Sequence, residues 1–146
     1  MRNQNHLFIA SGGNSAESCQ FNPGLSSTVL RRVNFDGTGS VSLLQRCSFF
    51  LRGMVVDENY VYIKDGDLDL KRISVNGGSL QTIAQDVGGC CGLVMDDTYL
   101  YWAKRESNSN NNGLFRVLKG GGAVVQIASI PNGDNIYYIR DLAVDD

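Results

Sequence analysis

Residues able to carry out catalysis are few in this sequence, and they lie far apart. Histidine occurs once, as His6, so a Ser/His/Asp or Cys/His system would have only this residue as its base. The acidic residues that could form an acid–base pair fall in different loops: Glu17, Asp65, Asp67, Glu106 and Asp134. The sequence contains no nucleophile elbow, metalloprotease helix, phosphate loop or dinucleotide fingerprint. We therefore expect a non-enzymatic protein without cofactor or metal; the alternative is a hydrolase or lyase whose site is built from scattered loop residues.

Four cysteines, Cys19, Cys47, Cys90 and Cys91, offer disulfide or thiol chemistry. Their spacing fits no zinc pattern, because Cys90 and Cys91 are adjacent and the chain has a single histidine. A disulfide from Cys19 to Cys47, or to one of the adjacent pair, would staple the long segment 12–28. Reduced thiols packed beneath loops are the alternative.

Location is not fixed by these patterns. Disulfides would suit an extracellular or periplasmic protein. The first six residues hold no apolar stretch of the kind that a signal peptide needs. We expect either a cytoplasmic protein or one whose leader was removed before this sequence begins.

Composition excludes several partners and favours one fold class. The net charge of −2 gives no electrostatic reason to expect nucleic acid. No stretch approaches the ~18 apolar residues that a membrane-spanning helix needs, so we expect no membrane partner. Seventeen glycines, two prolines and the lack of an amphipathic helical stretch suit short strands joined by tight turns. The 146 residues are enough for one domain with a real core, and an all-β domain is predicted.

One sequence pattern occurs three times along the chain. An apolar run ends in acidic residues, a Tyr-rich strand follows, and an Arg-centred strand and a glycine turn lead into a last strand. The arginines Arg32, Arg72 and Arg116 are 72−32 = 40 and 116−72 = 44 residues apart. A repeat of roughly 40–45 residues with four short strands is typical of a propeller blade. We predict a β-propeller with three four-stranded blades per chain.

The strands of each repeat, called A to D in chain order, can be assigned from this pattern. The middle repeat predicts strands at 52–56, 60–64, 68–75 and 80–84, and the next repeat predicts them at 92–95, 99–103, 114–118 and 124–128. The chain begins with a strand B at 6–10 and ends with a strand A at 140–146. The whole chain, 1–146, is thus expected to be one half-propeller domain.

The assembly is predicted from the fact that the chain begins at a strand B and ends at a strand A, so that one blade is split between the two termini. Blade 2 spans 52–84 and blade 3 spans 92–128, whereas blade 1 combines 6–45 with 140–146 from a partner copy. Three blades are too few for a ring, because propellers typically have about four to eight. We predict a homodimer that closes a six-bladed ring by exchange of the terminal strands. The alternative is a piece of a longer propeller chain; an isolated chain would leave two bare sheet edges.

The repeats resemble a known family. Asp96-Asp97-Thr98-Tyr99-Leu100-Tyr101-Trp102-Ala103-Lys104 and Gly113-Leu114-Phe115-Arg116-Val117 resemble the YWTD-type repeats of LDL-receptor-like six-bladed propellers, and bacterial extracellular propeller repeats still more. The resemblance covers nearly the whole chain. It implies six blades, and binding more often than catalysis, without naming a ligand. Lys104 and Ser11 stand where that family carries an aspartate, and only Asp65 keeps an acid there.

Loop lengths divide the expected propeller into two faces. The A–B and C–D turns are short, whereas the B–C and D–A connections on the other face are long and include all four cysteines. Binding residues tend to sit on long loops held by a rigid scaffold. We predict a binding or interaction module that recognises a small ligand, a glycan or a protein on the long-loop face.

Candidate ligand-binding residues lie on the long-loop face. Arg52, Cys91 and Arg140 are equivalent positions at the start of strand A, the innermost strand. In a dimer, four arginines would surround the channel entrance and could hold a carboxylate or phosphate. The alternative is that they pair with nearby acids, Asp86, Asp134 or Asp141. The full candidate set is Arg52, Arg140, Tyr137, Tyr138 and Arg105.

Other repeated residues are expected to be structural. Arg32, Arg72 and Arg116 recur with the blade. The acids Asp57, Asp96 and Asp145 read as turn formers whose side chains accept hydrogen bonds from local amides. Calcium binding there is disfavoured, because each turn offers few ligands.

Deletion of residues 140–146 tests the strand exchange. We expect the truncated chain to be monomeric or to aggregate, because the first blade would keep a bare edge. Light scattering on a sizing column gives the mass. A truncated chain that still dimerises cleanly would contradict closure by strand exchange.

Overall fold

The computed structural model describes residues 6–13, 27–47, 51–65, 68–88, 92–104, 112–129 and 142–145. All regular secondary structure in these residues is β, which confirms the predicted fold class. The strands are β1 (His6–Gly13), β2 (Ser27–Asn34), β3 (Val41–Cys47), β4 (Leu51–Val56), β5 (Tyr60–Asp65), β6 (Leu70–Ser74), β7 (Gln81–Ala84), β8 (Leu93–Met95), β9 (Tyr99–Lys104), β10 (Gly113–Leu118) and β11 (Val125–Ser129). In the middle and last repeats these bounds differ from the predicted ones by at most two residues.

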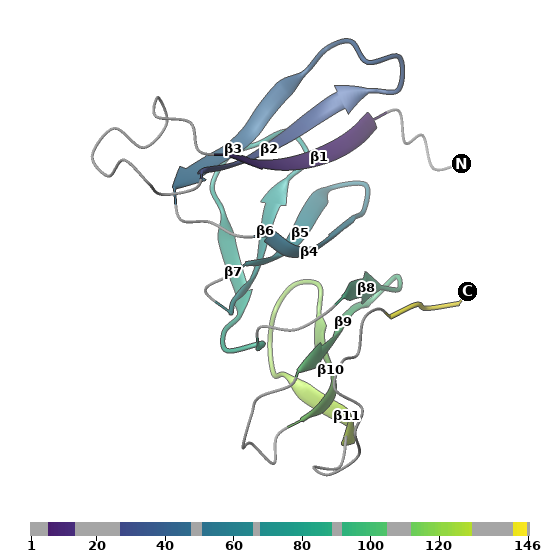
Figure 1. Cartoon of the computed structure of the whole chain (residues 1–146). Coiled ribbons are helices and arrows are strands. Elements are labelled where there is room, and N and C mark those ends of the chain that lie inside the picture. The colour runs from purple at the N-terminus through teal and green to yellow at the C-terminus, as the bar shows by residue number, and fades with distance from the viewer. Residues whose placement is uncertain are drawn as a thin grey trace.

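The strands form three antiparallel sheets in chain order. The first sheet has the order β1-β2-β3, the middle sheet β4-β5-β6-β7 and the last sheet β11-β10-β9-β8. Figure 1 shows the three sheets one above another, with the first at the top and the last at the bottom. Each sheet is a meander, because strands adjacent in sequence are hydrogen-bonded neighbours. None of the described sheets closes on itself.

Apolar side chains fill both spaces between the sheets. Between the first and middle sheets, Leu30 and Leu43 pack with Val61, Ile63 and Ile73. Between the middle and last sheets lies a second cluster, comprising Tyr62, Leu70, Ala84, Val87, Leu93, Leu100, Trp102, Phe115 and Val117. The middle sheet is therefore buried on both faces, and its strand β5 reads as a continuous buried run.

Three hairpin turns share one geometry. In each turn a glycine at a positive φ donates its N–H to a carbonyl three residues earlier: Gly37 (φ 81°) to Asn34, Gly77 (φ 87°) to Ser74 and Gly121 (φ 94°) to Leu118. Side chains with a Cβ rarely adopt this left-handed conformation, so glycine is required here. The three turns lie at one end of the strands together with the turns at 57–59 and 96–98. We call this the short-turn end, and the opposite end the long-loop end.

Arginines connect each sheet to the hairpin turn of the next one. The Arg32 Nη1 donates to the Val75 carbonyl oxygen at 3.1 Å and to the Asn76 Oδ1 at 2.8 Å. The Arg72 Nη1 donates to the Lys119 carbonyl oxygen at 3.0 Å. A structural role for Arg32 and Arg72 is thereby confirmed. We call each such contact an arginine clamp.

Gly113, at the start of β10, lies directly against the neighbouring strand. An added Cβ would collide with the Ala128 carbonyl oxygen, a backbone atom that cannot move without shifting β11. Gly113→Ala is therefore expected to lower the free energy of unfolding by about 1–3 kcal/mol, the usual cost of overpacking. Gly120→Ala is the matched control, because no heavy atom lies within 4 Å of a Cβ there. Urea denaturation measures both, and equal stabilities would contradict the close contact.

Candidate functional site

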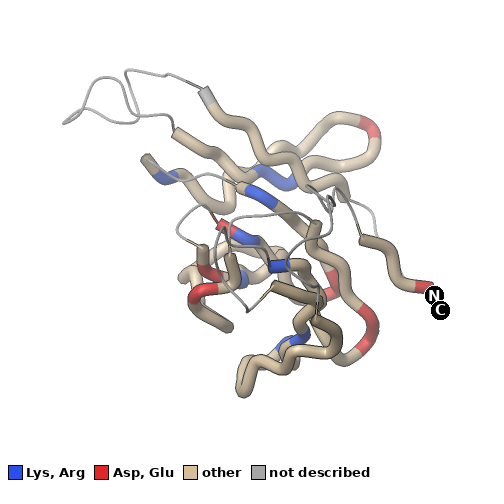
Figure 2. Tube along the Cα trace, turned by 60° about the horizontal axis from the view of Figure 1, so that its bottom comes forward, with Lys and Arg blue, Asp and Glu red and all other residues tan. Residues whose placement is uncertain are grey.

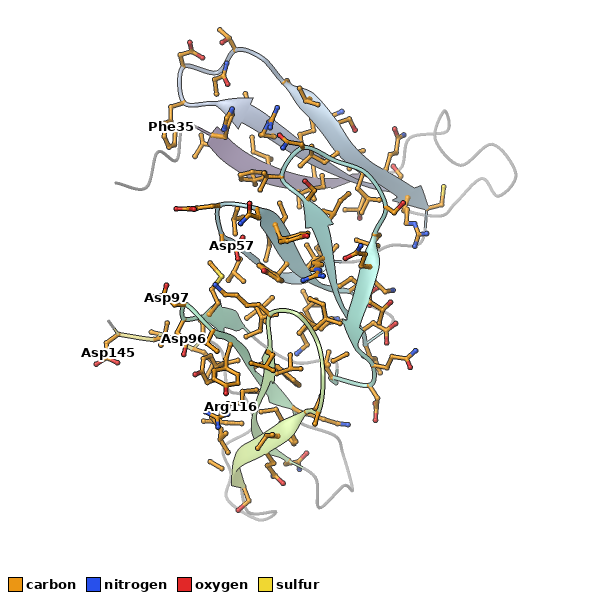
Figure 3. The ribbon with its side chains drawn as sticks, turned by 180° about the vertical axis from the view of Figure 1, so that it is seen from behind. Phe35, Asp57, Asp96, Asp97, Arg116 and Asp145 are labelled. Atoms are coloured by element: carbon orange, nitrogen blue, oxygen red, sulfur yellow. The ribbon has the colours of Figure 1, made fainter. Side chains whose placement is uncertain are left out.

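The short-turn end contains a recess with an acidic lining. Its volume is about 920 Å³, and it lies between the turns that follow β4 and β8. Of the described residues, five acids line it, Asp57, Glu58, Asp96, Asp97 and Asp145, together with one cation, Lys119. In Figure 3 the labelled acids Asp57, Asp96, Asp97 and Asp145 lie on one side of the molecule.

Two of these acids are already used to build the turns. Asp57 Oδ1 accepts the amides of Asn59 and Tyr60, both at 2.9 Å, and its Oδ2 accepts the Tyr62 hydroxyl at 2.9 Å. Asp96 makes the equivalent three bonds, each at 2.6 Å, with Thr98, Tyr99 and Tyr101. Their predicted role as turn formers is confirmed. These carboxylates are held by the protein itself, which leaves them poorly placed to bind a ligand.

Hydrogen bonding makes both carboxylates stronger acids than usual. Burial alone would raise the pKa of Asp57, but the amides of Asn59 and Tyr60, the Tyr62 hydroxyl and Lys119 outweigh it and lower that pKa. The Tyr101 hydroxyl and then the Tyr99 amide lower the pKa of Asp96. The two turns are thus stabilised by their ionised acids.

The long-loop end is where the candidate binding residues were expected. Arg52 lies in β4, is exposed, and is the extra residue of a bulge between Leu51 and Gly53. Bulges re-aim side chains and are frequent beside functional sites. Among the described residues no acid forms an ion pair with Arg52. The other candidates, Arg140, Tyr137, Tyr138 and Arg105, lie outside the described residues.

The cysteines were expected in the long loops. The strand β3 extends to Cys47, so this residue ends a strand instead of lying in the following loop. Cys47 forms a disulfide, and its partner lies outside the described residues, as do Cys19, Cys90 and Cys91. The pairing that we predicted for Cys19 stays a prediction.

Buried charges at the long-loop ends of β5 and β9 were not expected from the sequence. Lys64 is fully buried, and its Nζ lies 3.4 Å from the Ala103 carbonyl oxygen in the last sheet. Asp65, also fully buried, accepts hydrogen bonds from the Lys71 ammonium group and the Asp69 amide. Lys104 pairs with Asp86, whose Oδ2 lies 3.0 Å from its Nζ. A lysine at the end of a strand is usually solvated, so no local sequence pattern indicated this burial.

Lys64 and Arg52 lie close enough at this end to influence one another. Burial, and then the positive charge of Arg52, lower the pKa of Lys64 to about 8. Because the two cations repel one another, a bound anion beside them would be stabilised by both. Of the described charged residues, Lys and Arg lie chiefly within strands, and Asp and Glu chiefly outside them. Figure 2 shows the basic residues in blue and the acidic residues in red.

Comparisons with protein-family models and with curated proteins gave no significant match for this chain. In the part of the chain that the structure describes, no three His, Cys, Asp or Glu side chains are grouped so as to hold a metal ion. That same part contains no helix long and apolar enough to span a membrane.

The acidic turns predict a pH dependence of stability. Because the pKa values of Asp57 and Asp96 are lowered in the folded state, their stabilisation is present above the pKa of the unfolded chain. It is lost as the pH falls through the folded pKa. The Asp57→Asn/Asp96→Asn protein should therefore be less stable at pH 7, by about 1–3 kcal/mol for hydrogen bonds to a charged group, and lose less stability between neutral and acidic pH.

Urea denaturation at a series of pH values measures this difference. Glu58→Gln is the control, because the Glu58 side chain is exposed beside the same turn. Parallel pH profiles for the wild-type and double-variant proteins would contradict the role given to the two acids.

Proposed function

We propose that this chain is a non-enzymatic binding module that holds an anionic ligand, bearing a carboxylate or phosphate, at its long-loop end. In this proposal two copies form a six-bladed propeller, and the ligand lies at the mouth of the central channel. The observation that carries the binding proposal is the exposed, bulged Arg52 beside the buried Lys64. Arginine suits such a ligand because its planar fork of donors matches carboxylate and phosphate oxygens.

Several features support the six-bladed assembly. The middle and last sheets are four-stranded, whereas the first has three strands and leaves β1 at its edge. In the middle sheet the equivalent strand, β5, is covered by β4. A strand supplied by segment 140–146 of a partner would fill the corresponding place beside β1.

The inner position of Arg52 follows from the strand order. In a propeller the first strand of each blade lines the channel. The first strands β4 and β8 approach closely, because a Cβ on Gly53 would lie 3.0 Å from the Leu93 Cβ. Arg52 begins the run that leads to this contact, and would therefore lie at the channel entrance.

The acids at the short-turn end argue against anion binding at that end. The recess there offers five carboxylates to a ligand, which would repel an anion. Two of the five are already engaged by backbone amides and tyrosine hydroxyls. The long-loop end thus offers the better site.

One observation favours the alternative of a hydrolase or lyase. With a pKa of about 8, Lys64 is partly neutral near neutral pH and could accept a proton. Its full burial against the Ala103 carbonyl gives a substrate little access in the free chain, so we prefer the binding function.

Phosphate binding tests the proposal. We expect inorganic phosphate to bind to the wild-type protein, and Arg52→Gln to weaken binding about 10-fold or more, because a charged hydrogen bond is lost. Affinity should also fall as the pH rises through about 8, where Lys64 loses its proton. Isothermal titration calorimetry measures both effects, with acetate as the carboxylate probe.

Arg46→Gln is the matched control for this experiment. Arg46 is another exposed arginine, but it lies near the end of β3, at the edge of the first sheet. Equal phosphate affinity in the Arg52→Gln and Arg46→Gln proteins would contradict the proposed site. Turnover of phosphate or carboxylate esters that disappears with Lys64→Met would instead support the enzymatic alternative.

A further inference from the structure

Each sheet interface in the chain carries the same arginine clamp. Arg32 of the first sheet donates to the hairpin turn of the middle sheet at Val75, and Arg72 of the middle sheet donates to the hairpin turn of the last sheet at Lys119. Val75 and Lys119 occupy the same place in their turns, two residues before the glycine with positive φ. The clamp therefore joins an arginine to one fixed position of the next turn.

Arg116 of the last sheet adopts the same pose without a turn to clamp. Its guanidinium carbon lies 4.4 Å from the centre of the Tyr99 ring, just as that of Arg72 lies 4.4 Å from the centre of the Tyr60 ring. The tyrosine pairs beside them match as well, with ring centres 6.1 Å and 6.2 Å apart. The Arg116 Nε is buried with no hydrogen-bond acceptor among the described residues, as is the Nε of the clamped Arg32, so the two arginines match in this respect as well. This arginine is oriented for a clamp whose other half is not found among the described residues.

A hairpin turn that could accept this clamp lies in the first sheet, at the other end of the three sheets. In the turn that ends at Gly37 in the first sheet, the Gly37 N–H donates to the Asn34 carbonyl oxygen and the φ of Gly37 is 81°. The two turns already clamped have the same geometry. Phe35 stands where Val75 and Lys119 stand, and Asp36 stands where Asn76 stands. Phe35 is 62% exposed, the highest value among the large apolar residues described. Figure 3 shows Phe35 and Arg116 at opposite ends of the stack, both on the short-turn side.

The two outer sheet faces are complementary in other ways. Leu7 and Ile9 of β1 are 48% and 47% exposed, on the side of the first sheet that faces away from the middle sheet. Leu118 and Val125 are 46% and 44% exposed on the Arg116 side of the last sheet. Apolar faces of this kind are covered inside the chain, at both of its sheet interfaces.

We propose that the outer face of the last sheet docks onto the first sheet of a second copy of this chain, so that Arg116 clamps the partner's hairpin turn. Arg116 then donates to the carbonyl oxygen of the partner's Phe35 and to the Oδ2 atom of the partner's Asp36. The Asp36 Oδ1 is already used within its own turn, where it accepts the Thr38 amide and hydroxyl. The inference rests on the six-bladed assembly proposed above and names the residues that join its two halves. Asp36 replaces the neutral Asn76 of the internal clamp, so the contact between copies gains an ion pair.

A second copy fits these faces better than an unrelated partner. The chain carries both halves of the contact, an arginine on one outer face and its turn on the other. A twofold axis then forms the contact twice in one dimer, and no outer sheet face is left exposed.

Charge reversal tests the pairing of Arg116 with Asp36. In R116E both contacts set two acids against each other, and in D36R both set two arginines against each other. We expect each variant alone to sediment as one chain and an equimolar mixture to sediment as two, because one contact then has the reversed ion pair and the other the natural pair. Arg116→Ala should weaken the dimer about 100-fold, since each of two contacts loses a charged hydrogen bond worth about 10-fold.

Sedimentation equilibrium measures these masses, and circular dichroism shows that each variant is folded. R46E is the matched control. Arg46 is exposed and lies opposite Thr28 in the register of β2 and β3, on the side of the first sheet that faces the middle sheet. The R46E protein should therefore dimerise like the wild-type protein. If D36R does not fold, the dimer affinities of R116E and R46E decide, and equal values overturn the docking proposal.

The outcomes separate this inference from the assembly on which it rests. A wild-type protein that is monomeric at all concentrations overturns both. A wild-type dimer that R116E leaves intact, or two folded variants that stay monomeric when mixed, overturns only the clamp between copies.

Discussion

Every sheet in this structure must have both faces covered, and the rest of the architecture depends on that requirement. In β5, Val61 and Ile63 point toward the first sheet and Tyr62 toward the last, and none is more than 2% exposed. Such a strand would expose apolar surface if either neighbouring sheet were absent. The middle sheet has both faces covered within one chain, whereas the described residues cover only one face of the first sheet and one face of the last. Burial of apolar surface alone does not fix the orientation of one sheet relative to the next. The arginine clamps help to fix it, because each hydrogen-bonds one sheet to the hairpin turn of the next.

The strands could be predicted because their signals are local in sequence. Glycine turns, acidic turns and Tyr-rich runs each act within a few residues, and they located the strands of the middle and last sheets to within two positions. The contacts between sheets could not be read in this way, since Arg32 and Asn76 are 44 residues apart. The recurrence of arginine at each repeat indicated a structural role, but not the turn that it would clamp.

The candidate site was predictable only in part, for a related reason. Arg52 was identified because it begins a strand that recurs along the chain. Lys64 was missed, because a lysine at the end of a strand is usually solvated and nothing in its neighbours indicates burial. Its environment comes from the last sheet, through the Ala103 carbonyl oxygen. The burial of a residue by a neighbouring repeat therefore cannot be predicted from the sequence of its own repeat.

The proposed docking of unlike faces raises one geometric question, which is whether such an assembly closes. A contact that joins one end of a stack to the other end of a second copy is heterologous, and such contacts produce a ring if the rotation closes and a filament if it does not. Two copies contribute six sheets, within the range of about four to eight blades that closed propellers use. The clamp recurs in one form at both interfaces within the chain, so a third interface of the same form would continue the same rotation from sheet to sheet. The proposed ring requires six such steps to make one full turn, and a filament results if they do not.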